Sequence, residues 1–160
     1  YWRFNMPIPK LNRVVKDFSC AATSKQTIQL KSLRGKKVVI WFYPKDATPG
    51  CTTEGQGFRD NYTKFKNQNT VILGVSKDSL NSHEKFKEKQ KFQFELISDP
   101  DEKLCSQFSV IKEKNMYGRK YLGIERSTFL LDESGKLRYE WRKVKVAGHV
   151  EEVLEAVKNI

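Results

Sequence analysis

The chain has 160 residues, of which 38% are hydrophobic and 31% are charged, and its formal net charge is +11. A chain of this length buries enough apolar surface to fold without metal ions or disulfide bonds, so intrinsic disorder is excluded and residues 1–160 are expected to form one domain. No apolar segment approaches the ~20 residues of a membrane-spanning helix, and no secretory signal opens the sequence. We therefore expect a cytoplasmic protein without membrane contact.

Residues 1–5 precede Met6, and we leave them out of the fold expectations as either an extension or a cloning remnant. Strands are expected where β-branched and aromatic residues follow one another or alternate with polar residues. These segments are 27–30, 37–43, 70–76, 94–98, 127–131 and 137–141. After Lys37 the second segment is apolar throughout, which is typical of a central strand buried on both faces.

Helices are expected between these strands, where apolar residues recur at helical spacing after polar start signals. The helical segments are 51–65, the residues after Asp78-Ser79, 99–108 and the residues after Gly148. Residues 111–124 predict a loop because they contain Asn115, Gly118 and Gly123. The alternation of strands and helices predicts an α/β fold in which a central mixed β-sheet is flanked by helices on both faces.

The charge balance, 30 Lys and Arg against 19 Asp and Glu, can attract nucleic acid or other anions. The basic residues are mixed with acidic ones from Lys10 to Lys158, and no five basic residues follow one another. Such mixing is typical of a solvated surface, so no specific nucleic-acid partner is expected. A basic module that binds anions or nucleic acid without catalysis is kept as the alternative function.

The three cysteines are Cys20, Cys51 and Cys105, an odd number without a C-x-x-C pair. This spacing excludes a disulfide framework and does not support a zinc ribbon or a dithiol redox motif. The two histidines do not lie at ligand spacing from any cysteine, and neither a P-loop nor a G-x-G-x-x-G motif occurs. No metal and no cofactor are expected, so redox chemistry would fall to sulfur itself.

Cys51 follows a predicted strand and stands in the segment Pro44-Lys-Asp-Ala-Thr48-Pro-Gly-Cys51-Thr-Thr-Glu54. A cysteine in the first turn of a helix lies near unpaired backbone N–H groups and the positive end of the helix dipole, which favour thiolate over thiol. Thr48 can place a hydroxyl near the sulfur, and the prolines restrict the loop. An ordinary buried thiol is the alternative that these residues alone leave open.

This segment resembles the active-site signature of peroxiredoxins, P-x-x-x-T-x-x-C, and its P-G-C-T-x-E form is similar to the bacterioferritin comigratory protein branch, also called Q-type. Further similar stretches are Phe58-Arg-Asp60, residues 96–101, 115–121 and 123–130, and Gly148-His-Val-Glu-Glu-Val153. The resemblance extends from about residue 27 to the end of the chain. It implies a thioredoxin-like fold and thiol-dependent reduction of hydrogen peroxide and organic hydroperoxides.

The resemblance assigns a role to each matching residue. Cys51 corresponds to the peroxidatic cysteine, whose thiolate attacks a hydroperoxide and becomes a sulfenic acid. Thr48 orients the peroxide, and Pro44 shields the sulfur. Arg126 corresponds to the arginine that favours the thiolate and stabilises charge as the O–O bond breaks. Glu54 matches an acidic position and is expected to be structural, as a partner that holds Arg126.

The sequence departs from the branch at position 56. Many members carry a resolving cysteine there, five residues after the peroxidatic one, whereas this chain has Gln56. The sulfenic acid is therefore expected to be reduced by an external thiol such as thioredoxin, glutaredoxin or glutathione. The alternatives are that Cys105 or, less favoured, Cys20 resolves it. A monomer is expected from the resemblance.

Overall fold

The structure is a computed structural model and describes residues 9–160 of the chain, so the expectation about residues 1–5 lies outside the described residues. Its centre is a seven-stranded sheet of order β2-β1-β5-β4-β3-β8-β9, and β6 and β7 form a separate two-stranded sheet. The strands are β1 Ser19–Ala22, β2 Gln26–Gln29, β3 Lys37–Phe42, β4 Thr70–Ser76, β5 Glu95–Ser98, β6 Ile111–Met116, β7 Arg119–Ile124, β8 Ser127–Leu131 and β9 Leu137–Trp141.

The large sheet is mixed, as the sequence predicts. β3 runs parallel to β4, and β4 runs parallel to β5. β8 is antiparallel to β3 and to β9, whereas β1 is antiparallel to both β5 and β2. All six residues of β3 are buried, which confirms the expectation of a central strand covered on both faces. β1 was not among the predicted strands.

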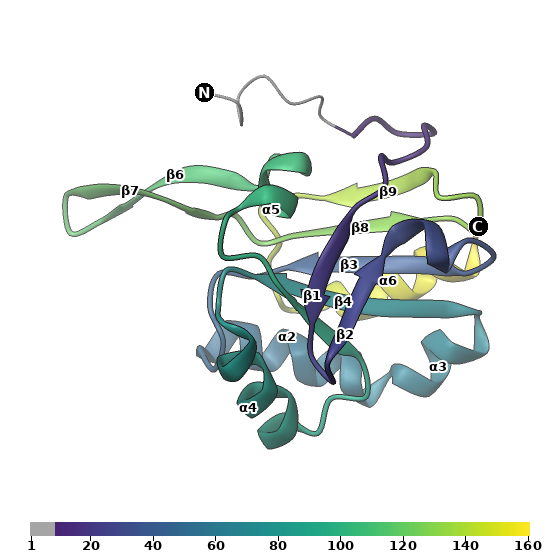
Figure 1. The fold of residues 1–160 in the computed structure, drawn as a ribbon, viewed down its shortest axis with the longest axis horizontal. Helices are drawn as coiled ribbons and strands as arrows, with labels where there is room; N and C mark the ends of the chain where they lie inside the picture. The colour runs from purple at the N-terminus through teal and green to yellow at the C-terminus, as the bar shows by residue number, and fades with distance from the viewer. Residues whose placement is uncertain (1–8) are drawn as a thin grey trace.

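The helices divide unequally between the two faces of the sheet. They are η1 Leu30–Leu33, α2 Pro49–Asp60, α3 Tyr62–Asn67, α4 Leu80–Gln90, α5 Lys103–Gln107 and α6 His149–Lys158. The core on one face contains side chains of α2, α3, α4 and α6, and that on the other contains side chains of α5, β1 and β2. Figure 1 shows α2, α3 and α4 together along one side of the sheet. This arrangement confirms a sheet flanked by helices.

Two predicted helices differ from the observed ones. The segment expected as one helix over 51–65 is broken at Asn61, whose side-chain amide donates to the Gly57 carbonyl at 2.9 Å and whose backbone leaves helical geometry. The helix expected over 99–108 is shorter, because Glu102 has a left-handed φ of 61°. The carboxylate of Asp99 instead accepts hydrogen bonds from the N–H groups of Leu104 and Cys105.

The loop expected over residues 111–124 is wrong, because this segment is the β6–β7 hairpin. Its turn consists of Tyr117 and Gly118, both with positive φ, which is the backbone of the tight turns that join antiparallel strands. Most of its side chains are exposed, so the strands lack the alternation of buried apolar residues that would have predicted them.

Candidate active site

Cys51 lies at the carboxyl end of β3, in the first turn of α2. The helix begins at Pro49 after Thr48, which has extended backbone angles, and its first backbone bond runs from the Thr52 N–H to the Thr48 carbonyl at 2.9 Å. The N–H groups of Gly50 and Cys51 therefore have no acceptor within the helix and remain directed toward the helix start. The Cys51 side chain is fully buried.

Arg126, between β7 and β8, brings a guanidinium to this helix start. Its Nη2 donates to Cys51 Sγ at 3.3 Å, and its Nη1 donates to Glu54 Oε1 at 2.6 Å. Glu54 is one turn along α2 from Cys51 and is fully buried, while the Arg126 side chain is 16% exposed. A Cβ atom at Gly50 would lie 3.1 Å from Nη2, so glycine permits this close approach. The contact expected between Glu54 and Arg126 is thus present.

Burial governs the electrostatics of this pair. Loss of solvent raises the pKa of Glu54 to about 7, although the charge of Arg126 opposes the rise. Burial by itself would lower the pKa of Arg126, but the charges of Glu54 and Cys51 outweigh it and raise that pKa above its ordinary value. Arg126 therefore carries a permanent positive charge against the sulfur.

A histidine that the sequence expectations did not place in the site lies behind this pair. His149, the first residue of α6, has its Nε2 2.8 Å from the Thr128 hydroxyl and 3.8 Å from Glu54 Oε2. That carboxyl oxygen is buried and has no hydrogen-bond partner among residues 9–160. Burial lowers the pKa of His149 to about 4, so the ring is neutral near pH 7.

The loop before α2 carries the two remaining predicted residues, Pro44 and Thr48, both partly buried. The sequence suggested that the Thr48 hydroxyl could bond to the sulfur. In the structure it donates to the Lys45 carbonyl at 2.8 Å instead. Its proton is thereby occupied, and its lone pairs are left to accept a hydrogen bond. Ala47, between the two, has a left-handed φ of 63°, which a non-glycine residue adopts only at some cost.

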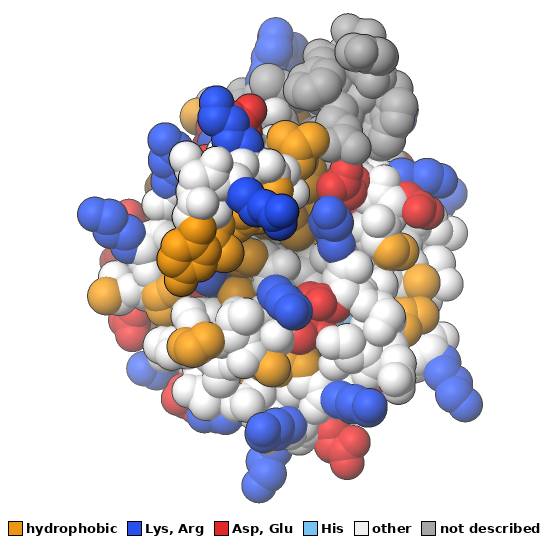
Figure 2. Space-filling view, turned by 90° about the vertical axis from the view of Figure 1, so that its left-hand side faces the viewer, with side chains coloured by type: hydrophobic (Ala, Val, Ile, Leu, Met, Phe, Trp, Pro, Cys, Tyr) orange, Lys and Arg blue, Asp and Glu red, His pale blue; other side chains and the backbone are white. Residues whose placement is uncertain are grey.

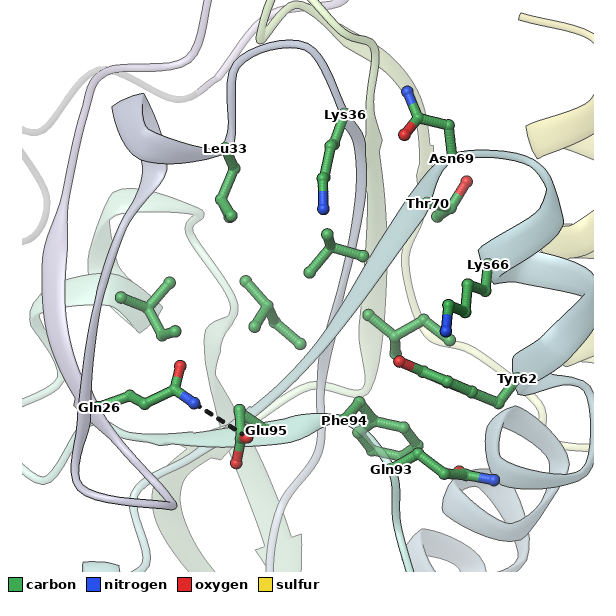
Figure 3. A pocket seen from close by; sticks show the side chains of 14 residues that line it. Gln26, Leu33, Lys36, Tyr62, Lys66, Asn69, Thr70, Gln93, Phe94 and Glu95 are labelled. Carbon is green, nitrogen blue, oxygen red and sulfur yellow. Dashed lines mark hydrogen bonds between the residues drawn. The ribbon is translucent and has the colours of Figure 1, made fainter.

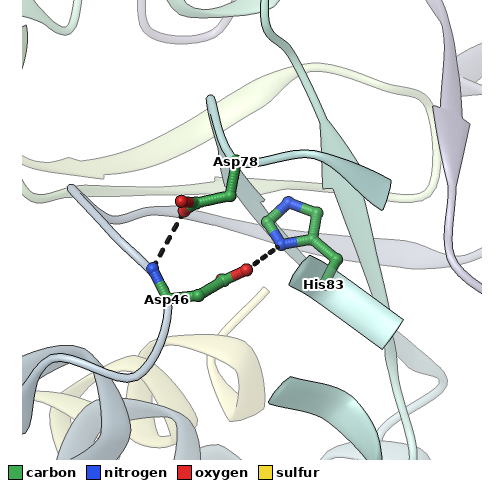
Figure 4. A group of neighbouring side chains, drawn as sticks. All are labelled: Asp46, Asp78 and His83. Atoms are coloured by element: carbon green, nitrogen blue, oxygen red, sulfur yellow. Dashed lines mark hydrogen bonds and ion pairs between the residues drawn. The ribbon is translucent and has the colours of Figure 1, made fainter. Parts of the chain in front are cut away.

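Asp46 holds this strained loop against the body of the protein. Its carboxylate accepts from the Tyr43 hydroxyl at 2.7 Å and from the Ser82 hydroxyl at 2.8 Å, and it lies 2.7 Å from His83 Nδ1. Its backbone N–H donates to Asp78 at 2.9 Å. Figure 4 shows Asp46 bonded both to Asp78, which lies between β4 and α4, and to His83 of α4. No sequence pattern indicated this set, because Asp46 and His83 are 37 residues apart.

Asp46, Asp78 and His83 also form the one group of potential metal ligands found among residues 9–160, with ligand atoms within 4.8 Å of one another. His83 Nε2 is 2.9 Å from the Ile97 carbonyl, which can only accept, so this nitrogen carries a proton. His83 Nδ1 and Asp46 Oδ2 are 2.7 Å apart, a hydrogen-bond distance. Two ligands of one tetrahedral ion would stand roughly 3.3 Å apart. The set is therefore built as a hydrogen-bond network.

The other two cysteines lie away from this site. Cys51 belongs to the core on the α2 and α6 face of the sheet, whereas Cys105 and Cys20 belong to or pack against the core on the opposite face. Cys105 is fully buried, and burial raises its pKa far above the ordinary value. Burial and the charge of Asp99 raise the pKa of Cys20 to about 11. Gln56, at the position of the absent resolving cysteine, donates to Gln90 of α4 at 2.9 Å.

A cavity of about 310 Å³ lies at the amino-terminal end of β4, next to α3 (Figure 3). Cys51 follows the carboxyl end of β3, which is parallel to β4, so the cavity and the cysteine are at opposite ends of the sheet. The described residues that line the cavity include no cysteine and no arginine. It therefore offers none of the groups assembled around Cys51.

Similarity to known proteins identifies the family of this chain. The sequence profile of the AhpC/TSA family matches residues 11–140. Peroxiredoxin Bcp of Xanthomonas campestris is 57% identical over 129 residues, which cover 81% of each chain, and Peroxiredoxin Bcp of Bacillus subtilis is 50% identical over 84% of this chain and 86% of that one. The chain belongs to the AhpC/TSA family.

Solved structures place this peroxiredoxin in the same branch. A structure of the X. campestris bacterioferritin comigratory protein, described in terms of its alkyl peroxide reduction activity, superposes with a TM-score of 0.87 at 49% identity and covers 95% of this chain and 97% of its own. BcpB of Mycobacterium tuberculosis gives 0.83 at 28% identity over 95% of this chain and 98% of its own. The fold is thioredoxin-like, and the protein is a thiol-dependent peroxidase.

Proposed function

We propose that Cys51 is the sulfur that this peroxidase oxidises. The thiolate attacks the terminal oxygen of a hydroperoxide ROOH, the O–O bond breaks, and its electron pair leaves with RO⁻, which takes a proton from water to become ROH. The sulfur is left as a sulfenic acid, Cys–SOH. The observation that carries this assignment is the 3.3 Å hydrogen bond from Arg126 to the buried sulfur at a helix start.

Each neighbouring group acts at a definite atom. The Arg126 guanidinium stabilises the thiolate before the reaction and the negative charge that moves onto the leaving oxygen during it. The free N–H groups of the first turn of α2 act in the same direction. Thr48 accepts a hydrogen bond from the hydroperoxide O–H, because its own proton is committed to Lys45. Pro44 shields the sulfur, and Glu54 positions Arg126 through the 2.6 Å contact.

An external thiol restores the enzyme in this proposal. A thiolate R′S⁻ attacks the sulfenic sulfur and releases hydroxide, which gives a mixed disulfide with Cys51. A second thiol then attacks that disulfide and returns Cys51 as a thiolate. The support is the placement of Cys105 and Cys20 in the core across the sheet from Cys51, since a direct bond would require Cα atoms within about 7 Å. Thioredoxin, glutaredoxin and glutathione are the candidate reductants.

Substrate and setting complete the proposal. Hydrogen peroxide and organic hydroperoxides are the proposed substrates, in line with the alkyl peroxide activity named for the X. campestris relative. None of the helices among residues 9–160 is both long and apolar enough to cross a membrane. Three free cysteines and a need for thiol reductant suit the reducing cytoplasm. The chain is proposed to act as a monomer and as one domain.

Mass spectrometry after one equivalent of peroxide tests the proposal, with turnover of single-cysteine variants beside it. We expect Cys51→Ser to abolish peroxidase turnover, and Cys105→Ser and Cys20→Ser to retain most of it with a dithiol reductant. When dimedone is added to react with the sulfenic acid, the oxidised wild-type protein should carry a dimedone adduct on Cys51. An internal disulfide between Cys51 and Cys105 or Cys20 would contradict the external route, and turnover by Cys51→Ser would overturn the assignment of the sulfur.

A further inference from the structure

The β6–β7 hairpin combines an exposed apolar surface with positive charge. Among the strands of the described residues, β6 and β7 pair only with each other, and in Figure 1 the hairpin extends away from the main sheet. Among the described residues, it holds half of the large exposed hydrophobic side chains, and its tip residue Tyr117 is 99% exposed. The exposed members are Met116, Tyr117, Tyr121 and Leu122. Within the part of the chain that the structure describes, these aromatic and aliphatic side chains remain exposed.

Basic side chains surround this apolar surface. The hairpin contains Lys112, Lys114, Arg119 and Lys120 against one acidic residue, Glu113. The single ion pair within it, between Lys120 and Glu113 at 3.7 Å, is solvent-exposed and weak. Figure 2 looks at the side of the molecule from which the hairpin extends and shows hydrophobic side chains gathered among Lys and Arg. This surface therefore favours a partner with apolar and acidic groups.

The hairpin stands beside the reactive sulfur. β7 ends at Ile124, two residues before Arg126, and the Glu125 N–H bonds to the Val110 carbonyl at 2.7 Å, which fixes the hairpin base at the site. Burial and the charge of Arg126 lower the pKa of Lys114, and the charge of Cys51 opposes them, so this lysine lies within electrostatic range of both. A protein that reaches Cys51 from this side would also meet the hairpin.

We propose that the β6–β7 hairpin is the docking surface for the protein thiol that reduces oxidised Cys51. This inference rests on the proposed external reduction of Cys51. The occupant is a small dithiol protein whose surface around the attacking thiol is apolar and carries net negative charge. A second copy of this chain is disfavoured as occupant, because each copy carries +11 and would bring its own basic hairpin to the contact.

Docking at this surface increases the encounter rate without changing the chemistry of the sulfur. The positive hairpin attracts the acidic partner over several ångströms, and the exposed Tyr117 and Leu122 bury apolar area once contact is made. The partner thiolate then attacks the sulfenic sulfur and displaces hydroxide to form the mixed disulfide, and the second thiol of the partner releases Cys51 with an oxidised partner as product. A small neutral dithiol gains nothing from the hairpin.

The test compares a variant with two charges reversed on the hairpin and a variant with two charges reversed on another element. Arg119→Glu with Lys120→Glu changes the hairpin, and Lys64→Glu with Lys66→Glu changes the net charge equally at exposed positions of α3. The probe is a thioredoxin of net negative charge, with dithiothreitol as the small reductant. At low ionic strength we expect kcat/KM for thioredoxin to fall about tenfold in the hairpin variant and less than twofold in the α3 variant, and the difference to shrink as salt rises.

Single-turnover oxidation by hydrogen peroxide and turnover with dithiothreitol are expected to stay within twofold of the wild type in both variants. An equal effect of the two variants on thioredoxin turnover would overturn the docking assignment while leaving the peroxidase proposal intact. Loss of the single-turnover oxidation in wild-type protein would instead overturn the proposed function. Tyr117→Ser with Leu122→Ser should weaken thioredoxin turnover without changing its salt dependence. Sedimentation that shows a dimer broken by either hairpin variant would assign the surface to a second copy and contradict the proposal.

Discussion

Replacing Glu54 by glutamine isolates the cost of the buried charge beside Arg126. Glutamine keeps the shape of the side chain and an oxygen that accepts from Arg126, but it does not titrate. In the folded protein burial raises the pKa of Glu54 from 4.5 to about 7. The folded state therefore holds the proton more tightly than the unfolded state, so the associated stability is full below pH 4.5 and is lost as the pH rises through 7.

The size of the effect follows from that interval. At ~1.4 kcal/mol for each pH unit, the loss between pH 4.5 and pH 7 amounts to roughly 3 kcal/mol for this fully buried group. At pH 4.5 both side chains are neutral, and Glu54→Gln should have nearly the stability of the wild type. By pH 7.5 the variant should be more stable than the wild type by roughly 3 kcal/mol.

Urea unfolding followed by tryptophan fluorescence measures this difference at several pH values between 4.5 and 8, with reductant present to keep the cysteines free. Glu155→Gln, at an exposed position of α6, is the matched control and should follow the wild type at every pH. The reasoning is refuted if the gap between Glu54→Gln and wild type stays constant across this range, or if the variant loses stability relative to wild type as the pH rises.

Three further substitutions test the groups around Cys51. Arg126→Met should slow oxidation of Cys51 by peroxide about a hundredfold or more in stopped-flow experiments, with the fold retained by circular dichroism; an unchanged rate would remove Arg126 from the mechanism. His83→Ala should lower the free energy of unfolding in urea by about 3–5 kcal/mol, because Asp46 loses a buried partner. It should also slow the reaction of Cys51 with peroxide more than its alkylation by iodoacetamide. Equal slowing of the two reactions would indicate a purely structural role. His149→Gln should remove a loss of stability as the pH falls from 6.5 to 4, since burial lowers the pKa of His149 to about 4 and the folded state resists its protonation; an unaltered acid slope would contradict this account.

The buried strands were predictable because their signal is local. The apolar run after Lys37 has only one stable location, the middle of a sheet, and β3 occupies it. The β6–β7 hairpin was missed because its strands bury little, so neither an apolar run nor an alternation marks them. Asn61 looks compatible with a continuing helix until its side chain competes for the Gly57 carbonyl, and that competition depends on three-dimensional geometry.

The candidate site shows the same division. Pro44, Thr48 and Cys51 form one short motif, and the helix start that follows could be derived from their spacing. Arg126 is 75 residues from Cys51, and only the family resemblance indicated their contact. Asp46 and His149 were absent from the expected site, because the buried partners that define them come from other elements and carry no spacing rule. Contacts between polar residues that are far apart in the sequence therefore could not be predicted from the sequence alone.

The second-order rate constant for reaction of the reduced protein with hydrogen peroxide at neutral pH is the most direct measurement of whether Cys51 is an activated thiolate. We expect it to exceed that of free cysteine by at least a hundredfold, to vanish in Cys51→Ser and to persist in Cys105→Ser. A rate no faster than that of a simple thiol, or a fast rate that survives Cys51→Ser, would contradict the assignment of this sulfur as the centre of the reaction.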